Sequence, residues 1–147
     1  RIVVVDRNPD ALALAEELGA DETVVADGGQ LEGILDLTGG LGAEVVIDFV
    51  AEQGAELDGP RMLRRAGSYF VIGYGGTVSI PTIDIISTEI NVVGNLVGTY
   101  SDLVQLMVLA ETGKVTLHTK TYPLASALDA FRDLDAGNVR GRAILVP

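Results

Sequence analysis

The sequence contains no cysteine, and this absence excludes several kinds of chemistry at once. Without cysteine there is no disulfide framework, no thiolate nucleophile and no thiolate ligand for zinc, which agrees with the cytoplasmic location that we predict. Histidine is almost absent as well, because His118 is the only one. A metal site at His118 is therefore not expected, and the spacing of the chain offers no Ser-His-Asp arrangement.

Long apolar runs and positive charge are also scarce. No apolar run approaches the roughly 20 residues that a membrane-spanning helix needs, so we predict no membrane partner. Ten Lys and Arg residues stand against 21 Asp and Glu residues, which gives a net charge of −11. Phosphates would be repelled by this charge, so we predict no nucleic-acid partner and interpret the charge as an aid to solubility.

Apolar residues are abundant, at 48% of 147 residues with a mean hydropathy of +0.35, enough for one ordinary domain with a sizeable core. Buried strands alternate with helical stretches along the chain. We expect strands at residues 1–5, 23–26, 44–50, 68–73 and 90–98, and helices at 9–18, 30–37 and 101–112. Repeated strand–helix units predict an α/β fold with a parallel sheet.

Several residues mark helix ends and turns. Asn8 is suited to cap a helix that has Pro9 in its first turn, and Gly19 is suited to end it. Gly59-Pro60 predicts a break in a helix, with Asp58 capping a second short helix. The stretch "TGGLG" at 38–42 runs from a helix into a strand, so we interpret it as a C-terminal turn rather than a phosphate loop.

Asp6 ends the first strand and is the first candidate site residue. A carboxylate there is suited to accept hydrogen bonds from a ribose and to repel a 2′-phosphate, which favours NAD over NADP. The alternative is that Asp6 only caps the following turn. Arg7 either lies over an adenine ring or is a solvated charge. In "IGYGG" at 72–76, Gly73 either lets a ring approach the backbone or belongs to a plain turn.

Five stretches, in this order, resemble the medium-chain dehydrogenase/reductase superfamily, particularly its zinc-type alcohol dehydrogenases: "VVVDRNPDALALAEELGAD", "GAEVVIDFVA", "RRAGSYFVIGYGG", "NVVGNLVGTYSDLVQLMVLAETGKV" and "NVRGRAILVP". The resemblance implies a doubly wound parallel Rossmann-type sheet. It implies a partial NAD-binding Rossmann domain at 1–120, followed at 121–147 by a C-terminal return to a GroES-like catalytic domain.

A strand that ends in an acid is usually the second strand of a dinucleotide-binding fold, and the glycine-rich loop comes about 20 residues earlier. We therefore expect the sheet to lack its first strand. In the order 3-2-1-4-5-6, strands two and four then have no shared neighbour. We expect either a poorly stable chain or a sheet that closes differently, because unpaired backbone groups are costly.

The resemblance implies that NAD is held near the strand ends. Arg7 is a further candidate contact, because it lies beside Asp6. The implied contacts are Asp6 at the ribose, Phe49 and Val50 at the adenine and ribose, Ile72 and Gly73 at the nicotinamide, Asn95 and Val97 at its carboxamide, and Arg140 at the pyrophosphate. An arginine suits the last task through its forked donors.

The function implied is the cofactor-binding portion of an alcohol or polyol dehydrogenase that transfers hydride between an alcohol and NAD. Zinc would be bound by an N-terminal domain outside this sequence, so the chain itself would contain no catalytic residue and no metal ligand. Residues 77–85 resemble the family segment that pairs across a dimer, which implies a homodimer or homotetramer. The alternatives are a zinc-free quinone or enoyl reductase of the same superfamily, a Rossmann-like methyltransferase, and a non-catalytic nucleotide-binding module.

Overall fold

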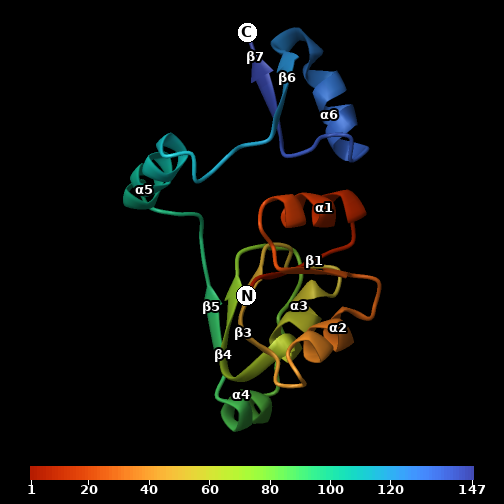
Figure 1. Cartoon of the computed structure of the whole chain (residues 1–147), viewed down its shortest axis with the longest axis vertical. Coiled ribbons are helices and arrows are strands. Elements are labelled where there is room, and N and C mark those ends of the chain that lie inside the picture. The colour runs from red at the N-terminus through yellow and green to blue at the C-terminus, as the bar shows by residue number, and fades with distance from the viewer. The chain divides into compact units, whose positions relative to one another are not determined.

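The computed structural model describes residues 1–147, and its contacts divide the chain into two compact units, Arg1–Val97 and Gly98–Pro147. Each unit combines helices with parallel strands (Figure 1). The predicted α/β class is therefore confirmed. The boundary predicted at residue 121, between the nucleotide-binding domain and the return to a catalytic domain, stays a prediction.

The first unit alternates strands and helices along its whole length. Its elements are β1 (Val3–Asp6), α1 (Pro9–Glu17), β2 (Glu22–Val25), α2 (Gln30–Leu37), β3 (Ala43–Asp48), α3 (Ala55–Asp58), the 3-10 helix η1 (Gly59–Met62), β4 (Leu63–Val71), α4 (Thr82–Thr88) and β5 (Asn91–Gly94). β1 pairs with β2, and β3, β4 and β5 form a second sheet in that order, with every pair parallel. The two sheets stay separate, so the sheet does not close across the position of the expected first strand.

The first helix has the predicted ends. The Asn8 side chain accepts a hydrogen bond from the Asp10 backbone N–H at 2.9 Å, and Pro9 occupies the first turn. Gly19 follows the helix with φ +101°, a left-handed conformation that glycine adopts without steric cost. These signals are local, which is why the sequence predicts this helix well.

The helix break at Gly59-Pro60 is confirmed, but the predicted cap at Asp58 is wrong. α3 ends at Asp58 and η1 begins at Gly59. Asp58 itself has helical backbone angles, φ −83° and ψ −36°, whereas a capping residue needs extended ones. Its carboxylate instead accepts a hydrogen bond from Gln30 Nε2 at 2.6 Å and pairs with Arg61 at 3.2 Å.

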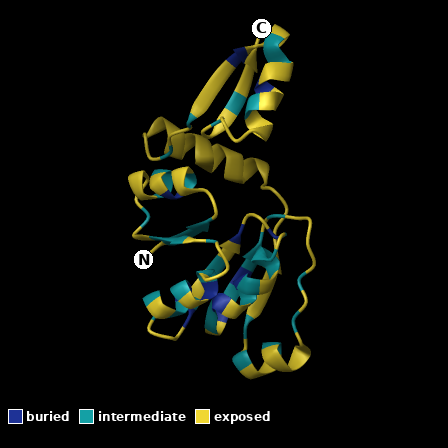
Figure 2. Cartoon of the chain, turned by 90° about the vertical axis from the view of Figure 1, so that its right-hand side faces the viewer, coloured by how far each residue is buried: buried dark blue, intermediate teal, exposed yellow.

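One small core joins the two sheets of the first unit. Leu31 and Ile34 of α2 are buried with Met62 of η1. The partly buried residues packed against them come from both sheets and from α2: Val3, Val5, Val24, Leu35, Ala43 and Val46. Figure 2 shows buried residues gathered where α2 and η1 meet the strands. α2 thus holds together two sheets that share no strand pairing.

The second unit is smaller and has one pair of strands. Its elements are α5 (Tyr100–Glu111), β6 (Thr119–Pro123), the 3-10 helix η2 (Leu124–Ser126), α6 (Ala127–Asp135) and β7 (Arg142–Val146), with β6 parallel to β7. α5 is exposed along its length (Figure 2). No helix of either unit combines the length and the apolar character that crossing a lipid bilayer requires.

A polar cluster ties α6 to β6 in the second unit. Asp133 Oδ2 accepts hydrogen bonds from Lys120 Nζ and from the Tyr122 hydroxyl, each at 2.7 Å. The hydrogen bond to Asp133 raises the pKa of Lys120 to about 12. The same two donors, Lys120 first, hold the pKa of Asp133 below its usual range.

Candidate functional site

The predicted cofactor residues of the first unit lie at the carboxyl ends of its strands. Asp6 ends β1 and Arg7 follows it, Phe49 and Val50 follow β3, Ile72 and Gly73 follow β4, and Asn95 and Val97 follow β5. Ligands of parallel sheets bind beyond these ends of the strands. The placement agrees with the prediction, although the role of each residue stays a prediction.

Asp6 is half-buried and uses one carboxylate oxygen locally. Its Oδ1 accepts a hydrogen bond from the Asn8 backbone N–H at 2.8 Å, so Asp6 does shape the following turn. Its Oδ2 accepts no hydrogen bond within the chain. The two interpretations of Asp6 are therefore compatible, because the turn occupies one oxygen and leaves the other available to a ligand.

Arg7 links the end of β1 to the loop that follows β3. Its Nη1 donates to Gln53 Oε1 at 2.7 Å, across 46 residues of sequence. Gln53 has φ +57°, an uncommon conformation for a residue with a side chain. This hydrogen bond brings the candidate ribose acid and the loop after β3 to one place, although β1 and β3 are not paired.

The loops after β3 and β4 are locked together by their backbones. Ile72 N–H and Gly73 N–H both donate to the Asp48 carbonyl at 2.9 Å, and Gly76 N–H donates to the Ala51 carbonyl at 2.8 Å. A Cβ atom on Gly73 would lie 2.4 Å from the backbone of Val50, closer than any side chain allows. Glycine is therefore required at position 73 by space.

Asp48 lies at the centre of these loops, and the sequence analysis missed it. Only 7% of Asp48 is exposed, and its Oδ1 accepts the backbone N–H groups of Val50 and Ala51, each at 2.8 Å. Its Oδ2 accepts the Tyr69 hydroxyl at 2.6 Å. Burial, followed by this hydrogen bond, raises the pKa of Tyr69 above its ordinary value. The available signal was an acid at the end of an apolar strand, the same signal that identified Asp6.

The surface around these loops is apolar and accessible. Large apolar side chains at the strand ends are more than a third exposed: Phe49 73%, Val50 52%, Ile72 37% and Val97 92%. Asn95 follows β5 directly, and its backbone N–H donates to the Val71 carbonyl at the end of β4, at 3.0 Å. Exposed apolar groups beside fixed backbone suit the flat rings of a dinucleotide.

The remaining predicted positions lie elsewhere. Arg140 belongs to the second unit, in the turn before β7, and its role at a pyrophosphate stays a prediction. His118 precedes β6, and its carbonyl accepts a hydrogen bond from the Arg142 backbone N–H at 2.9 Å. This contact joins the start of β6 to the start of β7. Residues 77–81 form no strand within the chain, and residues 82–85 begin α4, so pairing of 77–85 across a dimer also stays a prediction.

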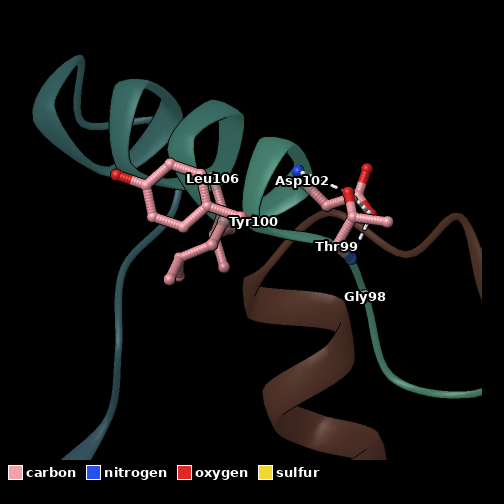
Figure 3. Close-up of a pocket in the computed structure, with 6 residues that line it drawn as sticks. Gly98, Thr99, Tyr100, Asp102 and Leu106 are labelled. Atoms are coloured by element: carbon pink, nitrogen blue, oxygen red, sulfur yellow. Dashed lines mark hydrogen bonds between the residues drawn. The ribbon is translucent and has the colours of Figure 1, made fainter.

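A cavity of about 390 Å³ opens at the start of α5 and contains none of the predicted residues (Figure 3). Two of its polar residues, Thr99 and Asp102, pair with each other. Asp102 Oδ2 accepts the Thr99 backbone N–H at 2.7 Å and the Thr99 hydroxyl at 2.8 Å, which keeps the pKa of Asp102 below its usual range. The rest of the lining is Gly98, Tyr100, Leu103 and Leu106. We assign this cavity to the capping of α5.

The chain is similar to known dehydrogenases over nearly its whole length. Residues 1–112 match a family model described as zinc-binding dehydrogenase. The chain is 34% identical over 149 residues to an NAD-dependent alcohol dehydrogenase of Sulfurisphaera tokodaii, covering 99% of this chain and 43% of that protein. It is 31% identical over 148 residues to a D-arabinose 1-dehydrogenase (NADP(+)) of Saccharolobus solfataricus, covering 99% and 42%.

A solved structure is similar over the same range. The alcohol dehydrogenase of Aeropyrum pernix superposes with a TM-score of 0.93 at 39% identity, and the match covers 99% of this chain and 42% of that one. The chain thus spans less than half the length of the relatives it matches.

Proposed function

This chain belongs to the zinc-binding dehydrogenase family, and we propose on that basis that it is the nucleotide-binding part of a cytoplasmic enzyme that transfers hydride between an alcohol and NAD. The observation that carries the proposal is the position of Asp6. It places an available carboxylate oxygen at the end of β1, joined through Arg7 and Gln53 to the apolar loop surface after β3. The quinone or enoyl reductase is the second candidate. The methyltransferase and the non-catalytic module are set aside, because the family match covers 112 of 147 residues.

Asp6 supports NAD rather than NADP as the cofactor. The relatives include one named as NAD-dependent and one named with NADP(+), so family membership alone does not choose between them. A carboxylate accepts hydrogen bonds from the two hydroxyls of an adenosine ribose and repels a 2′-phosphate. In our proposal Asp6 therefore selects NAD.

In our proposal, each of the other predicted residues contacts a different part of NAD. Phe49 and Val50 contact the adenine and ribose, Ile72 and Gly73 lie beside the nicotinamide, and the main chain at Asn95 and Val97 holds the carboxamide. Arg7 lies over the adenosine end, and Arg140 neutralises the pyrophosphate. NAD, when bound, supplies the hydride chemistry, and these residues orient its rings.

The residues of this chain do not fit a zinc site. The chain has no cysteine and one histidine, and no three His, Cys, Asp or Glu side chains lie close enough together to hold a metal ion. We derive no step through zinc from these residues. In our proposal, zinc binds to the part of the enzyme that lies outside this chain.

Cofactor titration tests the proposal directly. We expect the full-length protein to bind NAD more tightly than NADP in isothermal titration calorimetry, and to form NADH when an alcohol or polyol is added. A panel of primary alcohols, secondary alcohols, polyols and quinones would define the substrate class. Quinone reduction without alcohol oxidation would favour the reductase alternative, and a protein without affinity for NAD would contradict the proposal altogether.

We also propose that the enzyme is a homodimer or homotetramer that associates around residues 77–85. Ile83 and Ile86 support this, because α4 leaves 66% and 71% of these apolar side chains exposed. Replacing Ile83 with Lys should lower the mass measured by light scattering. Leu41→Lys is the matched control, because Leu41 is also largely exposed but lies in a turn after α2. Unchanged mass for a folded Ile83→Lys protein would argue against this interface.

A further inference from the structure

We propose that Asp48, held in place by Tyr69, is a positioning residue that sets the geometry of both cofactor-binding loops without touching the cofactor. The inference rests on the proposed function, because it assigns the loops after β3 and β4 to NAD. It adds two residues, Asp48 and Tyr69, to those that we propose for the cofactor site.

Both carboxylate oxygens of Asp48 accept hydrogen bonds from groups of the protein itself. Three donors of the protein occupy the two carboxylate oxygens, at 2.8, 2.8 and 2.6 Å, and the side chain is buried. A buried carboxylate is stable only when such partners satisfy it. Asp48 therefore acts on the loops and is not a ligand-binding acid.

The carboxylate of Asp48 fixes the start of the loop that follows β3. Its Oδ1 holds the backbone N–H groups of Val50 and Ala51, just where the chain leaves β3. Ala51 has φ +49°, followed by Gln53 at φ +57°. Residues with side chains adopt such angles only when surrounding contacts impose them. We infer that the carboxylate of Asp48 is one of these contacts.

The main chain of the same residue fixes the second loop. The Asp48 carbonyl accepts the backbone N–H groups of Ile72 and Gly73, which follow β4. The close approach of Gly73 to the Val50 backbone leaves no space for one loop to move independently of the other. A displacement of Val50 is therefore passed on to Gly73.

Tyr69 determines the direction of the carboxylate. It is completely buried within β4, where its register partner is Val46, and its hydroxyl reaches Asp48 two residues further along β3. The ring packs against Gly59, where a Cβ atom would lie 2.6 Å from Tyr69 Cε2. The order of contacts therefore runs from Gly59 to Tyr69, from Tyr69 to Asp48, and from Asp48 to the two loops.

This arrangement predicts a loss of cofactor affinity without a change in any residue that contacts NAD. A misplacement of about 1 Å in a binding element can cost about 100-fold in function. We expect Asp48→Ala to raise the Kd for NAD by about tenfold or more, because the loop loses its anchor. Asp48→Asn keeps an oxygen for Val50 and Ala51 and should recover most of the affinity.

The second unit provides a matched control. Tyr122 is also buried, and its hydroxyl also donates to a carboxylate, Asp133, at 2.7 Å. Tyr69→Phe and Tyr122→Phe each remove one such hydrogen bond. We expect Tyr69→Phe to raise the Kd for NAD several-fold and Tyr122→Phe to leave it unchanged.

The experiment measures NAD binding by calorimetry in the full-length protein, at a temperature where circular dichroism shows each variant to be folded. The KM for the alcohol serves as a second readout, and we expect it to stay constant. Tyr69→Phe decides the question even if Asp48→Ala does not fold. Equal Kd values for Tyr69→Phe and Tyr122→Phe would overturn the inference and leave Asp48 with a purely structural role. Lack of NAD binding by the unaltered protein would overturn the proposed function, and the inference with it.

Discussion

Asp6 ends β1 and Asp48 ends β3, each after a run of apolar strand residues. Asp6 is half-buried, and one of its carboxylate oxygens accepts nothing from the protein. Asp48 is buried, and both of its oxygens accept hydrogen bonds from the protein. The same local pattern thus gives a carboxylate that is available to a ligand in one place and one that is consumed by the fold in the other.

The difference arises from the neighbouring strand. The register partners of both aspartates are valines, and the difference lies two residues earlier in the neighbouring strand. There β4 has Tyr69, whose hydroxyl donates to Asp48, whereas β2 has Thr23, whose hydroxyl donates to Glu16. An acid at the end of a strand therefore becomes a binding residue or a structural one according to the strand next to it. Its own sequence does not decide this.

The largest expected effect is on stability. Asp48→Ala should lower the free energy of unfolding by about 3–5 kcal/mol, because three donors lose their acceptor, two of them in buried hydrogen bonds, and each buried loss costs about 1–3 kcal/mol. Asp6→Ala should cost about 1 kcal/mol or less, the value of one exposed turn cap. Urea unfolding of the two full-length variants would measure both values, and similar losses would show that the two aspartates are not different in kind.

The next effect is on the choice of cofactor. Asp6→Ser should lower the affinity for NAD by about 10- to 100-fold, since a hydrogen bond to a charged group contributes about 1.5–3 kcal/mol. It should also relax the discrimination against NADP. Asp48→Asn should change the kcat/KM for NAD and the kcat/KM for NADP by the same factor. The ratio of kcat/KM for the two cofactors measures this, and an unchanged ratio in Asp6→Ser would exclude the ribose role.

A smaller effect is expected from a change that touches neither aspartate. Gly59→Ala places a Cβ atom 2.6 Å from Tyr69 Cε2 and must displace the ring that holds Asp48. We expect this overpacking to lower the free energy of unfolding by about 1–2 kcal/mol. Gly94→Ala is the control, because no atom lies within 4 Å of the added Cβ. Thermal unfolding of both variants would test it, and equal shifts in Tm would mean that Tyr69 moves freely.

The smallest effect is on the pH dependence of stability. Because the pKa of Tyr69 is raised in the folded chain, the unfolded chain releases this proton first as the pH rises above about 10. The free energy of unfolding should then fall, by under about 1 kcal/mol between about pH 9 and about pH 10.5. Tyr69→Phe should show a shallower decline in urea unfolding at these two pH values. A decline as steep as that of the unaltered protein would remove Tyr69 as its cause.

Much of the fold could be predicted from the sequence because its signals are local. Asn8, Pro9 and Gly19 define α1 within one stretch of sequence, and the apolar spacing predicts α2 at 30–37, where the structure places it. The positions of the candidate site residues beyond the strands follow from the same order of elements. Contacts that span two elements were not predicted. The Asp48–Tyr69 pair depends on the register between β3 and β4, which neither strand encodes by itself.

The start of β4 shows the same limit. The sequence predicts a strand from 68, yet β4 begins at Leu63. Arg64, Arg65 and a glycine interrupt the apolar pattern, and the register between β3 and β4 shifts in this stretch. Ala66 accommodates the irregularity with φ +56°. A bulge of this kind depends on the partner strand and leaves little trace in the sequence.

The separation of the two sheets has a consequence for how this chain behaves in concentrated solution. β1 and β3 each keep one edge without a strand partner, and such an edge is a row of unpaired N–H and C=O groups that can template a strand from another molecule. The net charge of −11 opposes this encounter by mutual repulsion. Salt shortens the range of that repulsion to about 10 Å at 0.1 M, so the chain on its own should aggregate more readily as ionic strength rises.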